Sequence, residues 1–282
     1  MKKIFAILIC LLVLSYGAAC AYLFIFQRNL IYLPDEAYVA PDAQKLPNVE
    51  EITIKTDDGL SLTAWFVPSQ NDKYILYFNG NKSGIHLHQD FYATIIQSGY
   101  GLLAFNYRGY GGNKGEPTEQ GLYNDARAAV AFLQHRKIAL ENIIFLGRSL
   151  GSGVAVQIAT EYLPLAIALI SPYSSIADVA KLQYPYIPID FLLVDKFDSM
   201  AKSSQIASPT FIFHGADDLL IPISQAQKLH EAINGSELFI YKNQDHDNLD
   251  FGKIIADLNG ALNERLTLKK KVRLKETLTK TD

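Results

Sequence analysis

The chain has few cysteines, and only one part of it is apolar over a long stretch. Of its 282 residues two are cysteine, and both Cys10 and Cys20 lie in the first apolar run. The remainder therefore has no disulfide and no cysteine-based metal site. The formal net charge of −3 lacks the basic excess typical of nucleic-acid-binding domains, so we expect no nucleic-acid partner. No later apolar run is long enough for a second membrane span.

The long apolar run, Ile4–Phe26, follows Lys2 and Lys3 and contains no charged residue. At 1.5 Å per residue, about 23 residues cross the ~30 Å hydrocarbon core of a bilayer. The run also exceeds the ~7–15 apolar residues of a cleavable signal peptide. We predict a membrane anchor over residues 1–28, with a signal cleaved near residues 18–21 (AACA) as the alternative. Two lysines before the span and Arg28 after it predict a cytoplasmic N-terminus and a domain on the non-cytoplasmic side.

The rest of the chain reads as one α/β domain. Residues 29–48 contain several prolines and are expected to form an extended linker, residues 49–268 the domain, and residues 269–282 a basic tail. Polar and apolar residues alternate over 51–56 and 60–67 around an Asp57-Asp58-Gly59 turn, which predicts an antiparallel hairpin.

From residue 74 onward, short apolar runs alternate with helix-like segments. This order is typical of a mostly parallel sheet with helices on both faces. Strands are expected at residues 74–78, 102–105, 143–146, 165–170, 210–213 and 238–241, and helices near 86–97, 120–136, 154–162, 224–233 and 249–266. A hairpin that leads into a parallel sheet fits an alpha/beta-hydrolase fold.

An insert of about forty residues interrupts the alternation, which is far longer than the usual few residues between a strand and a helix. Its middle, residues 184–193 (YPYIPIDFLL), is aromatic and rich in proline. We interpret residues 172–208 as a small cap that supplies apolar walls over the site. The alternative is a helix with its loops packed on the sheet, serving stability alone.

A nucleophile-elbow pattern lies in the middle of the chain. The apolar strand of residues 143–146 runs into Gly147-Arg148-Ser149-Leu150-Gly151, a G-x-S-x-G sequence, and a helix-like segment follows. The glycines leave room for a strained turn that presents the Ser149 hydroxyl. The pattern predicts that Ser149 is a nucleophile.

The partners of such a serine follow it in the order acid, then histidine, in loops after later strands. Asp218 follows the strand of residues 210–213 and has the D-x-x-I-P spacing with Pro222; Asp217 is the alternative acid. His246 lies in the loop after the last strand and is predicted to relay the proton.

The negative charge that develops during acyl transfer requires backbone donors. We predict that these are the amide of Leu150, directly after the nucleophile, and the amide of Asn81, in the loop after residues 74–78. The other histidines (His86, His88, His135, His214 and His230) are interpreted as surface or packing residues. His86 and His88 do not have the spacing of helical metal ligands, so no metal is expected.

Taken together, these motifs resemble the alpha/beta-hydrolase superfamily, and within it the Bem46-like membrane-anchored group that includes ABHD13-type proteins. The resemblance rests on residues 28–34 (RNLIYLP), 78–83 (FNGNKS), 106–111 (NYRGYG), 147–151 and 218–222, and on His246. It implies a serine hydrolase that acts on esters or thioesters of acyl chains without a cofactor. Asn79, Asn106, Ser152 and Asp245 depart from the group's usual residues, but none of them removes a member of the triad.

The predicted function is therefore that of a membrane-tethered serine hydrolase with a lipid or small-molecule acyl ester or thioester as substrate. A non-catalytic scaffold with a hydrolase fold is the alternative from another class. It has no need for Ser149, Asp218 and His246 to occur together, as they do here. A third reading, acyl transfer to an alcohol or thiol, uses the same residues.

Overall fold

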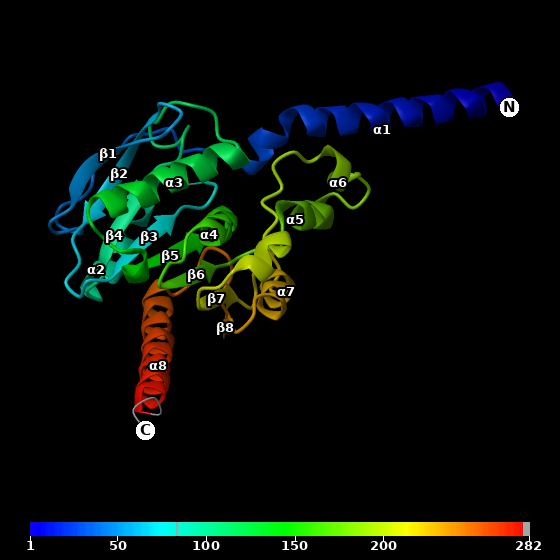
Figure 1. The fold of residues 1–282 in the computed structure, drawn as a ribbon. Helices are drawn as coiled ribbons and strands as arrows, with labels where there is room; N and C mark the ends of the chain where they lie inside the picture. The colour runs from blue at the N-terminus through cyan, green and yellow to red at the C-terminus, as the bar shows by residue number, and fades with distance from the viewer. Residues whose placement is uncertain (83, 279–282) are drawn as a thin grey trace.

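The computed structural model describes residues 1–82 and 84–278 and contains one eight-stranded sheet. Ser83, within the predicted oxyanion loop, and residues 279–282 of the predicted tail lie outside this range. The strand order is β1-β2-β4-β3-β5-β6-β7-β8 (Figure 1). Only the pairs β1–β2 and β2–β4 are antiparallel, and all the others are parallel. The strands are β1 (Glu50–Lys55), β2 (Ser61–Val67), β3 (Tyr74–Phe78), β4 (Gly101–Phe105), β5 (Ile143–Arg148), β6 (Ala166–Ile170), β7 (Thr210–Gly215) and β8 (Glu237–Tyr241). The predicted hairpin and parallel strands are confirmed.

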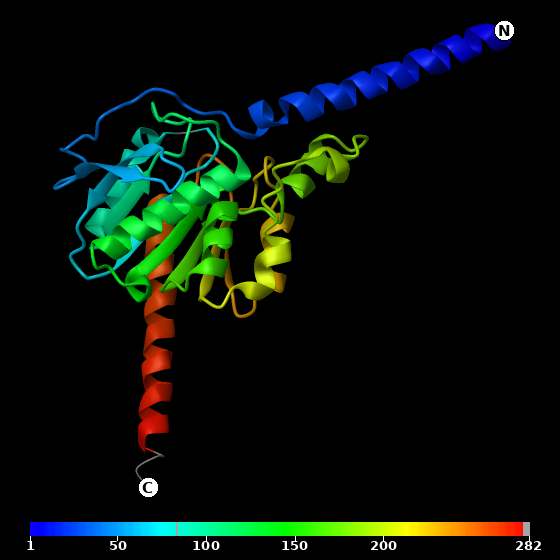
Figure 2. The same cartoon turned by 45° about the horizontal axis from the view of Figure 1, so that its top comes forward.

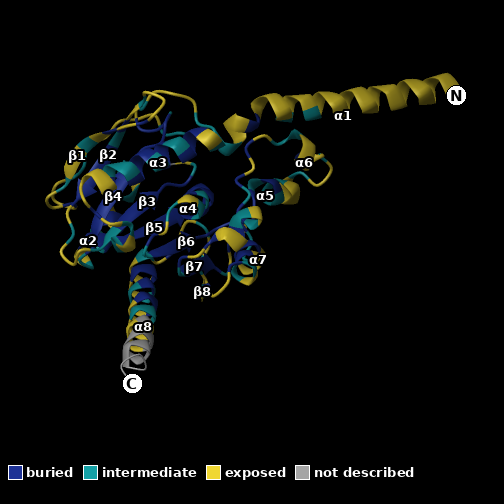
Figure 3. Ribbon diagram, in the orientation of Figure 1, coloured by how far each residue is buried: buried dark blue, intermediate teal, exposed yellow. Residues whose placement is uncertain are grey.

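Helices cover both faces of this sheet. They are α2 (Gln89–Gln97), α3 (Glu119–His135), α4 (Leu150–Glu161), α7 (Ser224–Ala232) and α8 (Phe251–Leu278), with short 3-10 turns at Ile85–His88 and Leu140–Asn142. Because successive side chains of a strand point to opposite faces, Leu76 and Phe78 pack in the core that includes α3, α4 and α7. Ile75 and Tyr77 pack in the second core, with α2 and α8. Figure 3 shows the buried sheet between these layers.

Helix boundaries differ from the predictions where local composition misleads. Helix α4 begins at Leu150 rather than at Val154. Its first turn was not predicted because it contains Gly151 and Gly153, and glycine has a low helix propensity. Helix α8 was expected to end near residue 266 but continues through most of the predicted tail to Leu278.

Helix α1 (Lys2–Ile31) is longer than the predicted anchor of residues 1–28 and leaves the body of the protein beside the insert (Figure 2). Its length and composition suffice to cross a membrane, and its most apolar stretch is not buried inside the structure. Tyr32 ends the helix in an extended conformation. Pro34 follows two residues later and disfavours a helical conformation at Leu33, the residue that precedes it. The linker therefore begins at Tyr32 rather than at Asn29, and it lies on the domain through backbone bonds such as Leu33 N–H to the Asn81 carbonyl, 3.1 Å.

The insert forms α5 (Ile176–Gln183), the short α6 (Ile189–Leu192) and a 3-10 helix at Met200–Gln205. Helices α5 and α6 lie next to the end of α1 in both views (Figures 1 and 2). The 3-10 helix instead packs against α4 and α7, which cover the sheet. The insert thus contains a part directed toward α1 and a part that packs on the body.

Candidate functional site

Ser149 occupies the sharp turn between β5 and α4. Its backbone φ of 50° and ψ of −120° are strained for a residue with a side chain, as expected for a nucleophile elbow. The turn is held by its neighbours: the Ser149 amide donates to the Ile170 carbonyl at 2.9 Å, and the Ser152 amide and hydroxyl both donate to the Ser149 carbonyl.

The two glycines of the motif are required by close backbone approaches. A Cβ atom at Gly151 would overlap the carbonyl oxygens of Phe78 and Asn79 at the end of β3. A Cβ at Gly147 would overlap the Gly151 carbonyl. The elbow can therefore lie directly beside the end of β3 only because both positions lack a side chain.

The three side chains predicted to act together lie in a single line. The Ser149 Oγ is 3.1 Å from His246 Nε2, and His246 Nδ1 is 2.8 Å from Asp218 Oδ2. They come from the elbow, from the loop of residues 242–248 after β8 (the histidine loop), and from the loop after β7. Asp217, the alternative acid, is exposed and takes no part in this line.

The carboxylate of Asp218 is fully buried and accepts hydrogen bonds on both oxygens. Oδ1 accepts from the amides of Leu220 and Ile221 at 3.0 and 2.8 Å, which explains the spacing between the acid and Pro222. Burial by itself would raise the pKa of Asp218, but hydrogen bonds from His214, His246 and the Ile221 amide outweigh it and hold the pKa well below the usual range. The acid is therefore ionised wherever the histidine is able to act as a base.

His214 contributes to this environment, which its sequence context did not reveal. Its ring is fully buried, which agrees with the packing half of its interpretation as a surface or packing residue, and its Nε2 lies 2.8 Å from the Ile221 carbonyl oxygen and 3.4 Å from Asp218 Oδ2. Because a carbonyl oxygen can only accept, Nε2 carries the hydrogen and directs it between these two oxygens. His214 lies near the carboxyl end of β7, a strand whose residues are all buried.

Arg148, the variable residue of the G-x-S-x-G motif, fixes the histidine loop. Its guanidinium donates to the His246 carbonyl at 3.0 Å and lies 3.6 Å from the Asp247 carboxylate. It also lies over the Phe251 ring at the start of α8, 5.5 Å from the ring centroid. The strand that leads into Ser149 thus also holds the loop that carries His246.

A cavity of about 310 Å³ opens in front of Ser149 and His246. Leu150 and Asn81, whose amides are the predicted oxyanion donors, both line it, as does Gly80 between β3 and Asn81. The Asn81 side chain points elsewhere, because its Nδ2 donates to the Ile31 carbonyl at 3.1 Å. The role of the Asn81 backbone amide as an oxyanion donor stays a prediction.

Two walls of this cavity come from segments far apart in sequence. Helix α5 contributes Ile176, Val179 and Tyr184 just beyond its end, so the insert supplies apolar walls as its interpretation as a cap requires. Leu30 and Ile31, the last residues of α1, line the opposite part. These two residues were expected in the linker, and their contribution to the site was not predicted.

Two of the departures from the resembled group have structural roles near the site. The side-chain Nδ2 of Asn79 donates to the Phe105 carbonyl at 2.7 Å and so connects the end of β3 to the end of β4. Asn106 Oδ1 accepts from the Ile85 amide at 2.8 Å. Within residues 1–82 and 84–278, no group of three or more His, Cys, Asp or Glu side chains is placed to hold a metal ion.

Comparison with known proteins identifies a matching family and several relatives. The model of a family described as serine aminopeptidase, S33, matches residues 69–189. The protein Rv2307c of Mycobacterium tuberculosis is 34% identical over 207 residues, which cover 72% of this chain and 74% of that protein. The human alpha/beta hydrolase domain-containing protein 17B is 32% identical over 209 residues, 73% of this chain and 71% of that protein.

Solved structures show the same fold at low sequence identity. The Pyrococcus furiosus esterase Pf2001 has a TM-score of 0.68 at 19% identity and covers 83% of this chain and 97% of its own. An alpha-beta hydrolase from Vibrio vulnificus has a TM-score of 0.67 at 19% identity, with coverages of 85% and 92%. The fold is that of an alpha/beta hydrolase. The chain belongs to the alpha/beta-hydrolase superfamily, as its motifs predicted.

Proposed function

We propose that this protein is a membrane-tethered serine hydrolase that cleaves carboxylic esters or thioesters of acyl chains. The observation that carries the proposal is the continuous line from Ser149 Oγ through His246 to Asp218, with distances of 3.1 and 2.8 Å. A serine hydroxyl becomes a useful nucleophile when a base accepts its proton and a third group orients that base. All three groups are in hydrogen-bond contact here.

In the proposed mechanism, Ser149 Oγ attacks the substrate carbonyl while His246 Nε2 accepts the serine proton. Asp218 keeps the other ring hydrogen on Nδ1 and stabilises the imidazolium. The amides of Leu150 and Asn81 donate to the oxyanion. His246 then gives its proton to the departing alkoxide or thiolate, which leaves an acyl-enzyme, and a water molecule deprotonated by His246 releases the acid.

The charges around the cavity favour an ester or thioester over a peptide with a free amino terminus. An ammonium group requires an unpaired carboxylate nearby. Among the described residues, the carboxylate that lines the cavity is that of Asp247, which is 90% exposed and lies 3.6 Å from Arg148. The other charged residues of the lining, Lys82 and Arg148, are cations that would repel an ammonium.

Tethering is proposed from α1, whose residues 4–26 are almost all exposed in the structure although they are apolar. Such a face is costly in water and stable in a bilayer. The lysines at positions 2 and 3 favour a cytoplasmic N-terminus with the domain on the other side. A periplasmic or extracellular reporter fused after the domain would test this orientation.

The test of the chemistry is labelling of the full chain, in lipid nanodiscs, with a fluorophosphonate probe. Wild type and the control Ser204→Ala, an exposed serine of the insert, are expected to be labelled, and Ser149→Ala is not. Hydrolysis of p-nitrophenyl butyrate should follow the same pattern, with Ser149→Ala lower by at least about 10⁴ in kcat. A folded wild-type protein that neither reacts with the probe nor cleaves the ester would instead support a scaffold.

A further inference from the structure

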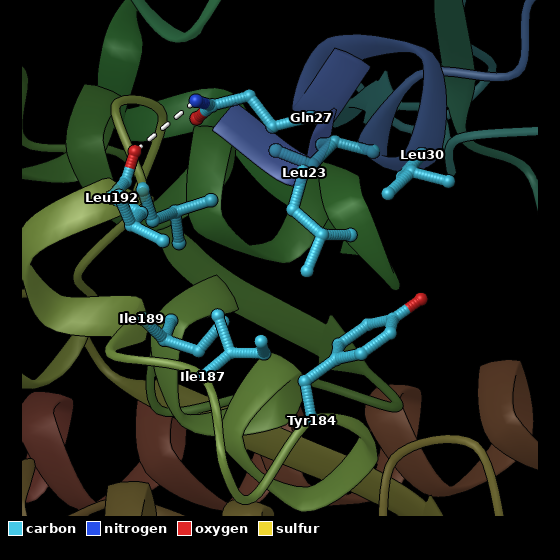
Figure 4. Close-up of a pocket in the computed structure, with 9 residues that line it drawn as sticks. Leu23, Gln27, Leu30, Tyr184, Ile187, Ile189 and Leu192 are labelled. Atoms are coloured by element: carbon cyan, nitrogen blue, oxygen red, sulfur yellow. Dashed lines mark hydrogen bonds between the residues drawn. The ribbon is translucent and has the colours of Figure 1, made fainter. Parts of the chain in front are cut away.

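A second hollow lies beside the cavity of Ser149, between α1 and the insert (Figure 4). Leu23 of α1 points across it toward Ile187 and Tyr184 of the insert, and Ile189 and Leu192 complete the far side. All its lining residues but Gln27 are hydrophobic or aromatic. We call this hollow the α1 groove.

Both polar atoms of the Gln27 side chain in the α1 groove already have hydrogen-bond partners. Gln27 Nε2 donates to the carbonyls of Phe24 and Leu192 at 2.8 and 3.1 Å, and its Oε1 accepts from the Val194 amide at 2.7 Å. Its polar atoms therefore hold α1 against the insert rather than face a ligand, and the surface of the groove is functionally apolar.

The α1 groove adjoins the cavity of the candidate active site. Leu30, Ile31 and Tyr184 line both. From Leu23 to Ile31 the groove follows α1 for about 12 Å at 1.5 Å per residue. Because each carbon–carbon bond of ~1.5 Å advances an extended chain by slightly less than its length, roughly ten carbons would fill this distance.

The far end of the α1 groove lies where α1 becomes an exposed apolar helix. Tyr22 and Ile25, one residue before and two residues after Leu23, are 60% and 66% exposed. If α1 spans a bilayer, this end of the groove is directed toward the hydrocarbon, where acyl chains are located. An apolar groove with one end at the nucleophile and the other at the anchor fits an acyl chain that lies along the anchor.

We infer that the α1 groove binds the acyl chain of the substrate, so that the anchor helix itself forms one wall of the acyl-binding site. This inference rests on the proposed function, since it places the acyl carbonyl at Ser149. It adds a substrate class, esters and thioesters with acyl chains of about ten carbons or more, and it assigns chain-length selection to α1 and the insert together.

The first experiment measures the preference for acyl-chain length, with the full-length protein in nanodiscs. The substrates are p-nitrophenyl butyrate and p-nitrophenyl decanoate, at concentrations below those at which they form micelles. Each methylene buried in the groove raises kcat/KM by up to about fourfold, so decanoate should exceed butyrate at least tenfold. Leu23→Trp and Ile187→Trp fill the groove with an indole and should reduce the decanoate-to-butyrate ratio at least tenfold. Ile25→Trp, on the exposed side of the same helix, is the matched control and should keep the ratio.

A second experiment does not depend on turnover. A photoreactive palmitic acid is added to Ser149→Ala protein in phosphatidylcholine nanodiscs, and labelled peptides of residues 184–193 are quantified. We expect labelling that Leu23→Trp reduces at least fivefold and Ile25→Trp does not. Equal labelling of both variants, or none on this segment, overturns the inference, as does an unchanged ester ratio. Failure of the proposed function itself would appear separately, as an unreactive Ser149 in a protein that still takes up the fatty acid.

Discussion

Replacing Asp218 with asparagine keeps the shape of the side chain but changes which hydrogen His246 can hold. Asp218 Oδ1 accepts from two backbone amides, at 2.8 and 3.0 Å, so the asparagine carbonyl oxygen must occupy that position. The reverse orientation would set an NH₂ group against both amides and lose two buried hydrogen bonds, at a cost of about 1–3 kcal/mol each. The NH₂ group of the introduced asparagine therefore replaces Oδ2 and faces the His246 ring.

In this fixed orientation, the introduced asparagine favours the tautomer of His246 that cannot accept the serine proton. The new NH₂ group donates to His246 Nδ1, which drives the ring hydrogen to Nε2, the atom that is 3.1 Å from Ser149 Oγ. The nitrogen that should accept the serine proton then already carries one. In serine proteases the same change lowers kcat by about 10⁴, or about 5 kcal/mol of transition-state stabilisation. We expect a loss of that order here.

The assay is kcat and KM for p-nitrophenyl butyrate with the full chain, with Asp217→Asn as the matched control because Asp217 is exposed and outside the line. We expect kcat of Asp218→Asn to fall by about 10³- to 10⁴-fold with KM nearly unchanged, and the control to keep its activity. Retention of activity within tenfold in Asp218→Asn, or an equal loss in Asp217→Asn, would refute the reasoning.

The same variant should change the pH dependence of stability. The pKa of Asp218 is lowered in the folded protein, so its carboxylate stabilises the fold above the unfolded pKa of about 3.9. That contribution is lost as pH falls through the lower folded value. Urea unfolding should therefore show the largest deficit of Asp218→Asn near pH 6 and a smaller one below pH 4, whereas a deficit that is constant with pH would contradict the assignment.

Three further substitutions test the supports of the site, and a fourth, on α8, serves as a comparison. Arg148→Ala removes a charged hydrogen bond to the histidine loop, so kcat/KM should fall about 10- to 100-fold in ester assays while a fluorophosphonate still labels the protein. Gly151→Ala should abolish expression of folded protein because its Cβ atom would overlap the backbone at the end of β3. Gly260→Ala, in open space on α8, should instead stabilise the fold by up to about 1 kcal/mol. Asp195→Ala leaves the buried Tyr32 hydroxyl without its acceptor, and a loss of about 2 kcal/mol should lower Tm by about 4–8 °C in a thermal scan; an unchanged Tm would show that this contact does not secure the end of α1.

The fold, and the three side chains that lie in line at the candidate site, could be predicted because each depends on a local pattern. Buried parallel strands give continuous apolar runs, and the elbow needs glycines at fixed positions around Ser149. The acid was located by its spacing to Pro222, which reflects the turn in which Asp218 accepts two backbone amides. Such short-range constraints leave a trace in a single sequence.

The supports of the site could not be predicted because they depend on contacts between distant segments. Nothing near His214 in sequence shows that its ring reaches Asp218, and nothing near Arg148 shows that it holds a carbonyl ninety-eight residues away. The helix of residues 29–31 was missed for a related reason. Of these residues, Leu30 and Ile31 line the α1 groove and the cavity of Ser149, and such contacts with distant segments leave no local pattern.

The end of α1 is better regarded as part of the domain than as a separate anchor. Arg28 and Tyr32 both bond to Asp195 of the insert at 3.1 Å, and Gln27 bonds to the residues on either side of Leu193. These contacts hold the insert in the position from which α5 lines the cavity of Ser149. Any displacement of α1 must therefore either move the insert with it or break these hydrogen bonds. A domain that begins after residue 28 would keep Leu30 and Ile31 at the cavity, but it would lose Leu23 and Gln27 of the α1 groove and the hydrogen bonds of Gln27 and Arg28 to the insert.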